Sequence, residues 1–100
     1  MLVVFSTFPD EATARKICAA LVAEGLVACA NILPPITSIY RWQGELKEDR
    51  EILAILKLPA QGFPAFEEKL TALHPYEVPE IVAIPVAAVN EKYLAWVNGV

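Results

Sequence analysis

Few residues of this sequence could do chemistry, and the first of them is its single histidine, His74. An imidazole titrates near neutral pH and is a common metal ligand, so His74 could bind a metal or transfer a proton. It also precedes Pro75, at the expected end of a helix, where a histidine more often complements the last backbone carbonyls. Metal binding by His74 therefore needs support from other ligands.

The two cysteines do not supply that support through their spacing. Cys18 and Cys29 both lie in apolar stretches, so packing in the core is the expected role of each. A closed transition-metal site needs about four ligands, and the sequence contains no HxxxH, CxxC or CxxH spacing. A metal site would have to be assembled across subunits or from weaker ligands.

Three charged residues remain as candidates for ligand binding. Glu77 and Glu80 flank Val78-Pro79 in an extended, rigid segment, where their carboxylates could serve a cation or a hydrogen-bonding ligand. A solvated pair of loop charges is the alternative. Lys57 ends an apolar segment, where a charge needs a partner. It could bind an anion or form an ion pair with an acidic residue nearby.

Catalytic motifs are missing from the sequence, which has no GxSxG, P-loop or GxGxxG pattern. Ser6 and Thr7 follow an apolar run, yet no base is assigned to either hydroxyl. We therefore expect a binding protein and not an enzyme.

The amino-acid composition limits the classes of partner that the protein is expected to bind. A net charge of −4 argues against nucleic acid, which needs a basic surface. Apolar residues make up 56% of the sequence, more than a small domain can bury in its own core. This excess indicates self-association. No apolar run approaches the ~18 residues that span a bilayer, and the N-terminus lacks the features of a signal peptide. We expect a cytoplasmic protein with reduced thiols and no membrane partner.

These residues must be positioned by one domain, residues 1–100. Apolar runs predict buried strands at residues 1–8, 26–33, 52–58 and 81–86. Asp10 is the expected N-cap of a first helix that ends before Gly25, and a second helix starts with Pro64 and ends at His74. A short third helix is expected from Asn90 through Val97. The apolar faces of the first two helices are predicted to hold Ala14, Ile17, Cys18, Leu21 and Val22, and Phe63, Phe66, Leu70 and Leu73.

An uneven β-hairpin over residues 36–57 is the most distinctive predicted element. Residues 36–42 alternate in polarity, and Gln43-Gly44 supplies the turn. As one strand, residues 45–57 would span about 43 Å, more than the roughly 35 Å diameter expected of such a domain. The charged run 45–51 could instead be a solvated loop or helical turn. In the long hairpin, the apolar rings of Tyr40 and Trp42 would be exposed to solvent, and another copy of the chain is the simplest partner that would bury them.

The order of elements predicts an α+β, ferredoxin-like fold of the βαββαβ type, with a long hairpin and a short C-terminal helix. Both larger helices would cover one face of an antiparallel sheet. The other face would stay bare, and this again favours a partner.

Three motifs give the chain a close resemblance to one family. They are Ala-Cys-x-Asn-Ile at 28–32, Ser-x-Tyr-x-Trp-x-Gly at 38–44 and His-Pro-Tyr-x-x-Pro-Glu at 74–80. With these motifs the sequence resembles the CutA divalent-cation-tolerance proteins over nearly its whole length. The resemblance implies a cytoplasmic homotrimer, similar in shape to the PII signalling proteins, with small effectors or divalent metals such as copper in the clefts between subunits.

The resemblance also implies a site. Copper ligands proposed for the family are a cysteine at the end of the first strand and a His-His pair, and this chain has Ser6 and Leu73-His74 there. His74, Glu80 and Cys29 are then the candidate metal ligands. Tyr40, Trp42, Lys57 and Tyr76 are expected to line the ligand cleft. A stable trimeric scaffold with incidental metal binding is the alternative.

Overall fold

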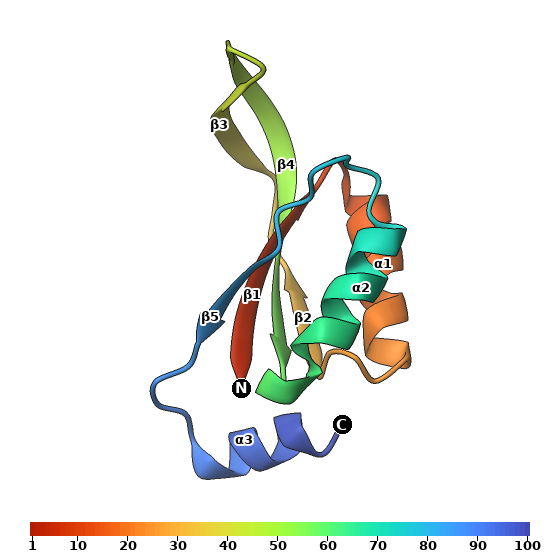
Figure 1. Cartoon of the computed structure of the whole chain (residues 1–100), viewed down its shortest axis with the longest axis vertical. Helices are drawn as coiled ribbons and strands as arrows, with labels where there is room; N and C mark the ends of the chain where they lie inside the picture. Colours follow the sequence, from red (N-terminus) through yellow and green to blue (C-terminus); the bar gives the residue numbers. More distant parts are fainter.

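The computed structural model describes residues 1–100 as an antiparallel sheet with two helices against one face (Figure 1). The expected α+β, ferredoxin-like architecture is confirmed. The strands are β1 (Leu2–Phe8), β2 (Cys29–Ile32), β3 (Ile36–Trp42), β4 (Glu45–Leu58) and β5 (Val82–Pro85). The helices are α1 (Glu11–Ala23), the short 3₁₀ helix η1 (Ala60–Gly62), α2 (Phe63–Leu73) and α3 (Glu91–Asn98).

The sheet has the order β2-β4-β1-β5, and β3 pairs with β4 beyond the end of the others. β1 and β4 lie at the centre, with Leu2 opposite Leu58 and Phe8 opposite Ile52. β5 pairs only with β1, so it is an edge strand, and Pro85 closes its register opposite Leu2. Pro85 fits this edge position, because proline has no N–H to donate to a second neighbouring strand.

Local signals placed the helix ends correctly. The Asp10 side chain caps α1 by accepting a hydrogen bond from the Thr13 backbone N–H at 2.7 Å, and Asn90 caps α3 in the same way. Gly25 follows α1 with a φ of 71°, the left-handed geometry in which glycine pays no steric cost. α2 ends at Leu73, as the proline two residues later requires.

Four expectations about packing were wrong in detail. Cys29 was expected in the core but is only half-buried, because it lies on β2, an edge strand of the sheet. Val22 and Leu73, predicted on the apolar faces of their helices, are 39% and 38% exposed. Val22 lies at the border of a buried stripe narrower than predicted, and Leu73 occupies the last turn of α2, where His74 is buried in its place. β2 covers Cys29–Ile32 and not residues 26–33. The apolar run extends further because it also includes Val27 and Ala28, which are buried in the connection before the strand.

The hairpin is long and continuous. β4 is one strand of 14 residues, so the charged run 45–51 is a strand and not a loop. Gln43 and Gly44 both have positive φ, 51° and 80°, as a tight two-residue hairpin turn requires. The chain measures 44 × 26 × 24 Å, and the hairpin extends its long axis beyond the sheet (Figure 1).

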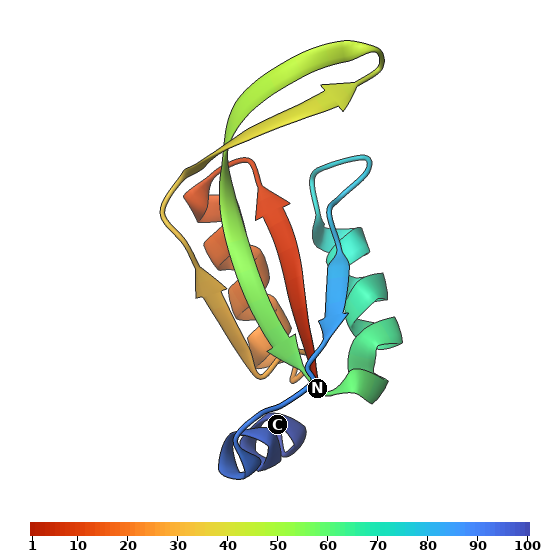
Figure 2. The ribbon, with the colours of Figure 1, turned by 90° about the vertical axis from the view of Figure 1, so that its left-hand side faces the viewer.

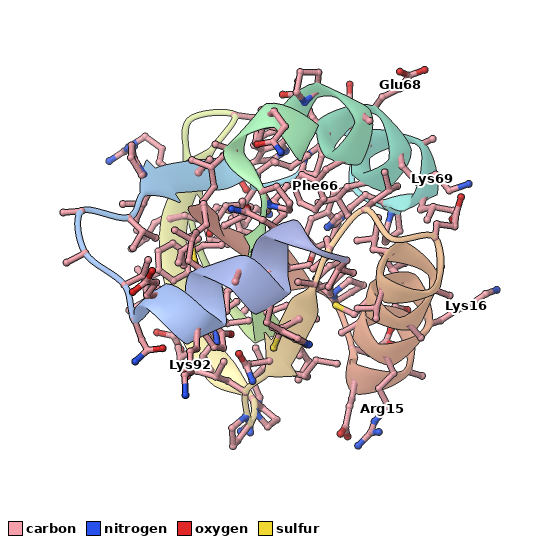
Figure 3. The ribbon with its side chains drawn as sticks, turned by 90° about the horizontal axis from the view of Figure 1, so that it is seen from below. Arg15, Lys16, Phe66, Glu68, Lys69 and Lys92 are labelled. Carbon is pink, nitrogen blue, oxygen red and sulfur yellow. The ribbon has the colours of Figure 1, made fainter.

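A core of 13 buried residues fills the space between the sheet and its two covering helices. Phe66 of α2 points into this space when the molecule is seen from below, whereas Lys16, Glu68 and Lys69 point outward (Figure 3). Cys18 belongs to the core as predicted, and burial raises the pKa of its thiol to about 11. The Ser6 hydroxyl is buried on the same side of β1 without a hydrogen-bond partner.

The opposite face of the sheet is bare, as expected. Figure 2 looks onto this face, with α1 and α2 behind the strands and the hairpin bending across the top. Val3, Phe5 and Ile55 are only partly buried there, and Val82 and Ile84 of β5 are exposed. Every helix of the chain is too short or too polar to span a bilayer.

Candidate ligand cleft

An open cleft of about 930 Å³ lies between the hairpin and the segment that follows α2. The ribbon of the hairpin bends over that segment (Figure 2). One wall belongs to β3 and β4, and the other to residues 75–80. Five of the residues predicted to bind a ligand line this cleft. They are Tyr40, Trp42, Tyr76, Glu77 and Glu80.

Strand register explains the hairpin wall. Ser38 lies opposite Asp49, and Ile36 lies opposite Glu51, so these residues share the face that carries Tyr40. This is the face that the alternation of residues 36–42 predicted. Two of the cleft's carboxylates therefore come from the charged run of β4.

Two tyrosine–carboxylate pairs organise the cleft. The Tyr40 hydroxyl donates to Asp49, and the Tyr76 hydroxyl donates to Glu51 Oε2 at 2.7 Å. The hydrogen bond to Asp49 raises the pKa of Tyr40, and burial, followed by the bond to Glu51, raises that of Tyr76. Both hydroxyls therefore stay protonated and hold the two carboxylates in place.

Glu80 faces the same space without a side-chain hydrogen bond or ion pair. Burial raises its pKa, and the charge of Glu51 raises it further. Both causes disfavour the ionised form. A cation between Glu51 and Glu80 would offset the repulsion between their charges.

His74 lies behind the cleft and is 7% exposed. Its Nδ1 accepts a hydrogen bond from the Tyr76 backbone N–H at 3.1 Å, so the proton of the neutral ring is on Nε2, which donates to the Thr7 carbonyl at 2.9 Å. The ring stacks on Phe8 with centroids 4.8 Å apart. Burial lowers the pKa of His74, so it is neutral at neutral pH.

The remaining candidates, Cys29 and Lys57, lie at the other end of the sheet. They are register partners, and Lys57 Nζ donates to Asn31 Oδ1 at 2.8 Å. The ammonium also lies 5.9 Å from the centre of the Tyr93 ring on α3. Thr7, which meets His74, pairs with Leu53, four positions from Lys57 and about 13 Å along the strand.

A single chain does not bring together enough ligands to form a metal site. No group of three or more His, Cys, Asp or Glu side chains is placed to hold an ion. Cys29 lies far from His74, and both ring nitrogens of His74 already have hydrogen-bond partners. Metal ligation by His74, Glu80 and Cys29 therefore stays a prediction that needs a second chain or a rearrangement.

Sequence reasoning missed Asp49 and Glu51 as cleft residues. In the run Glu-Leu-Lys-Glu-Asp-Arg-Glu they looked like solvated charges. A signal was available, because a two-residue turn at Gln43-Gly44 fixes the register and puts both carboxylates on the face of Tyr40.

Comparison with known proteins agrees with this architecture. Residues 2–100 match the family described as CutA1 divalent ion tolerance protein. The divalent-cation tolerance protein CutA of Thermus thermophilus is 55% identical over 96 residues, which cover 96% of this chain and 93% of that protein. The mouse protein CutA is 45% identical, and the match covers 54% of its length.

A solved structure gives the same result. The divalent cation tolerance protein of Thermus thermophilus superposes with a TM-score of 0.95 at 53% identity, covering 99% of this chain and 97% of that chain. The match includes the sheet, the helices and the hairpin. The chain therefore belongs to the CutA1 divalent ion tolerance family.

Proposed function

We propose that this protein is a cytoplasmic, cation-responsive homotrimer, PII-like in plan, that binds a divalent metal such as copper or a small effector in clefts between subunits. The observation that carries the proposal is the open, carboxylate-rich cleft beside the overhanging hairpin. It fits the name of the Thermus thermophilus relative, a divalent-cation tolerance protein. Binding and not turnover is the proposed activity.

The apolar surface supports self-association. Tyr40 and Trp42 are 40% and 39% exposed on the hairpin, and Val82 and Ile84 are exposed on the bare face of the sheet. Large contiguous apolar surfaces are rare on monomeric proteins. A second and third copy of the chain would cover both regions.

A trimeric scaffold is the second candidate function. The hydrogen bonds at both nitrogens of His74 favour it, since they leave no free lone pair for copper. Ser6 and Leu73 also favour the scaffold. Neither side chain has the thiol or the imidazole that is proposed to bind copper in the CutA family.

A copper(II) titration by calorimetry, on protein stripped with a chelator, separates the two functions. Metal binding predicts about one or three ions per trimer, weakened in Glu80→Ala and His74→Ala variants that stay trimeric. The mass in solution, recorded alongside, should be three times the 11.0 kDa of one chain. An intact trimer that takes up no copper would support the scaffold.

Replacing Trp42 with aspartate tests the assembly. A buried carboxylate without a partner is costly, so we expect the variant to dissociate at protein concentrations where the parent is trimeric. Sedimentation over a range of concentrations gives the readout. Arg41→Asp changes charge at the neighbouring exposed position and is the matched control. Equal trimer stability in Trp42→Asp and the parent would exclude this role.

A further inference from the structure

We propose that Asn98 is a site of spontaneous deamidation and that the last turn of α3 controls the rate of this modification. The inference depends neither on a ligand of the cleft nor on a metal. It stands on the Asn98-Gly99 sequence, on the hydrogen bonds of the Gly99 backbone and on the packing of α3 against β4.

The reaction needs only the chain and water. The backbone nitrogen of Gly99 loses its proton to hydroxide and attacks Cγ of Asn98, so a new C–N bond closes a five-membered imide. The bond from Cγ to Nδ2 breaks, and Nδ2 takes a proton from water and leaves as ammonia. A water molecule then opens the imide at either carbonyl and leaves aspartate or isoaspartate at position 98. Glycine favours this attack, because no Cβ stands beside its nitrogen.

Asn98 differs from the other two asparagines of the chain. Asn31 precedes an isoleucine, and its Oδ1 accepts a hydrogen bond from Lys57 Nζ at 2.8 Å. Asn90 precedes a glutamate, and its Oδ1 accepts a hydrogen bond from the Tyr93 backbone N–H at 3.1 Å. Asn98 precedes a glycine, is exposed and has no side-chain hydrogen bond. It is therefore the asparagine at which we expect the reaction.

The folded end of α3 opposes ring closure. Asn98 is the last residue of α3, and the Gly99 N–H donates to the Ala95 carbonyl at 3.0 Å and to the Trp96 carbonyl at 3.2 Å. These bonds hold the proton that must leave. Side chains of a helix also point toward its N-terminus, away from the next backbone nitrogen. The imide can therefore close only when the last turn of α3 opens.

The packing of α3 determines how often that turn opens. Figure 1 shows α3 at the end of the sheet opposite the hairpin. Val97 is the only buried residue of this eight-residue helix, and the Tyr93 ring lies 5.9 Å from Lys57 Nζ of β4. Helix ends with few buried contacts open far more often than the whole chain unfolds. Asn98 therefore reacts from a locally opened state of the folded protein.

Deamidation makes this opening permanent. The new carboxylate lies at the negative end of the helix dipole, and α3 has no basic residue in its last turn to offset it. Isoaspartate also adds a methylene to the main chain, which disrupts the bonds from the Gly99 N–H to the Ala95 and Trp96 carbonyls. The modified chain keeps a loosened α3, with Val97 exposed more often.

Peptide mass spectrometry on the native protein, aged at pH 8, tests the inference. We expect Asn98 to convert at least about tenfold faster than Asn31 and Asn90 in the same sample. We also expect Asn98 to convert about tenfold more slowly in the folded protein than in urea, where α3 is absent.

Two substitutions in α3 should change the folded rate in opposite directions. Val97→Ala removes the buried side chain and should raise the rate about fivefold. Ala95→Lys puts a positive charge in the last turn and should lower the rate about twofold. Lys92→Ala truncates an exposed side chain of the same helix and is the matched control. Each folded rate is divided by the rate of the same variant in urea, which cancels the effect of neighbouring side chains.

Two results would overturn the inference outright. One is conversion of Asn98 no faster than that of Asn31 and Asn90, and the other is equal conversion of Asn98 in folded protein and in urea. Rates of Val97→Ala and Ala95→Lys that equal the parent would overturn control by α3. If circular dichroism shows that Val97→Ala is unfolded, Ala95→Lys alone decides this point.

Discussion

Replacing Phe8 with alanine is expected to lower the free energy of unfolding by about 3–5 kcal/mol. Phe8 is fully buried at the end of β1, where its ring packs in the core and stacks on His74 at an interplanar angle of 17°. Truncation removes this apolar surface and leaves a cavity between the sheet and the end of α2. It also removes the ring that supports His74 behind the cleft.

Urea denaturation at one fixed protein concentration measures this loss, because the stability of an oligomer depends on concentration. Phe8→Leu is the matched variant, since it keeps much of the volume and should cost only about 1 kcal/mol. If alanine and leucine gave the same small loss, Phe8 would not be the packing residue that its burial indicates.

Replacing His74 with phenylalanine is expected to cost about 2–4 kcal/mol, although the ring shape is kept. The substitution leaves the Thr7 carbonyl and the Tyr76 N–H without their partners, and a buried unsatisfied group costs about 1–3 kcal/mol. Stacking on Phe8 can persist. Urea denaturation at pH 8, where the histidine of the parent is neutral, isolates the hydrogen bonds. A change below about 0.5 kcal/mol there would contradict this role.

The same residue should make stability depend on pH. Burial lowers the pKa of folded His74 below its ordinary 6.5, while the charge of Glu51 and the bond to Thr7 offset part of that effect. The unfolded chain therefore binds the proton first as pH falls. The contribution of His74 is complete above pH 6.5 and is lost as pH falls toward the lower folded pKa. His74→Phe should remove this slope.

Glu80 changes the free energy of unfolding with pH in the opposite direction, so its effect must be measured separately from that of His74. Its folded pKa is raised above the ordinary 4.5, so its contribution favours the folded state at low pH and is lost as pH rises through that folded pKa. Unfolding curves between pH 5 and pH 8 should therefore be compared in a Glu80→Gln background. A slope unchanged by His74→Phe in that background would assign the pH dependence to another group.

Local chemistry made much of this fold predictable. Capping by Asp10, the stop at Gly25 and the hairpin turn at Gln43-Gly44 each follow from short-range geometry. The alternation of residues 36–42 even identified the face on which Tyr40 and Trp42 meet the cleft. The choice between strand and loop for residues 45–51 was open, because their composition favours neither and pairing with β3 decides it.

Only some of the cleft residues could be predicted from the sequence, because contacts between distant parts of the chain bring the two walls together. Tyr76 and Glu80 approach the hairpin because α2 ends near the end of β1, where His74 binds the Thr7 carbonyl. No local pattern encodes that contact, so Glu51 could not be assigned to Tyr76 in advance. Cys29 and Lys57 were grouped with these residues by motif, while the strand register puts them at the far end of the sheet.

The charged half of β4 has a consequence for solubility. β3 pairs only with β4, and residues 45–51 of β4 pair only with β3, so both sides of the hairpin are open edges. Open edges invite further strands and can seed fibres. Six of the seven residues 45–51 are charged, which discourages indiscriminate strand addition along that edge. The carboxylates that line the cleft thus belong to a run that also protects a long, exposed hairpin from aggregation.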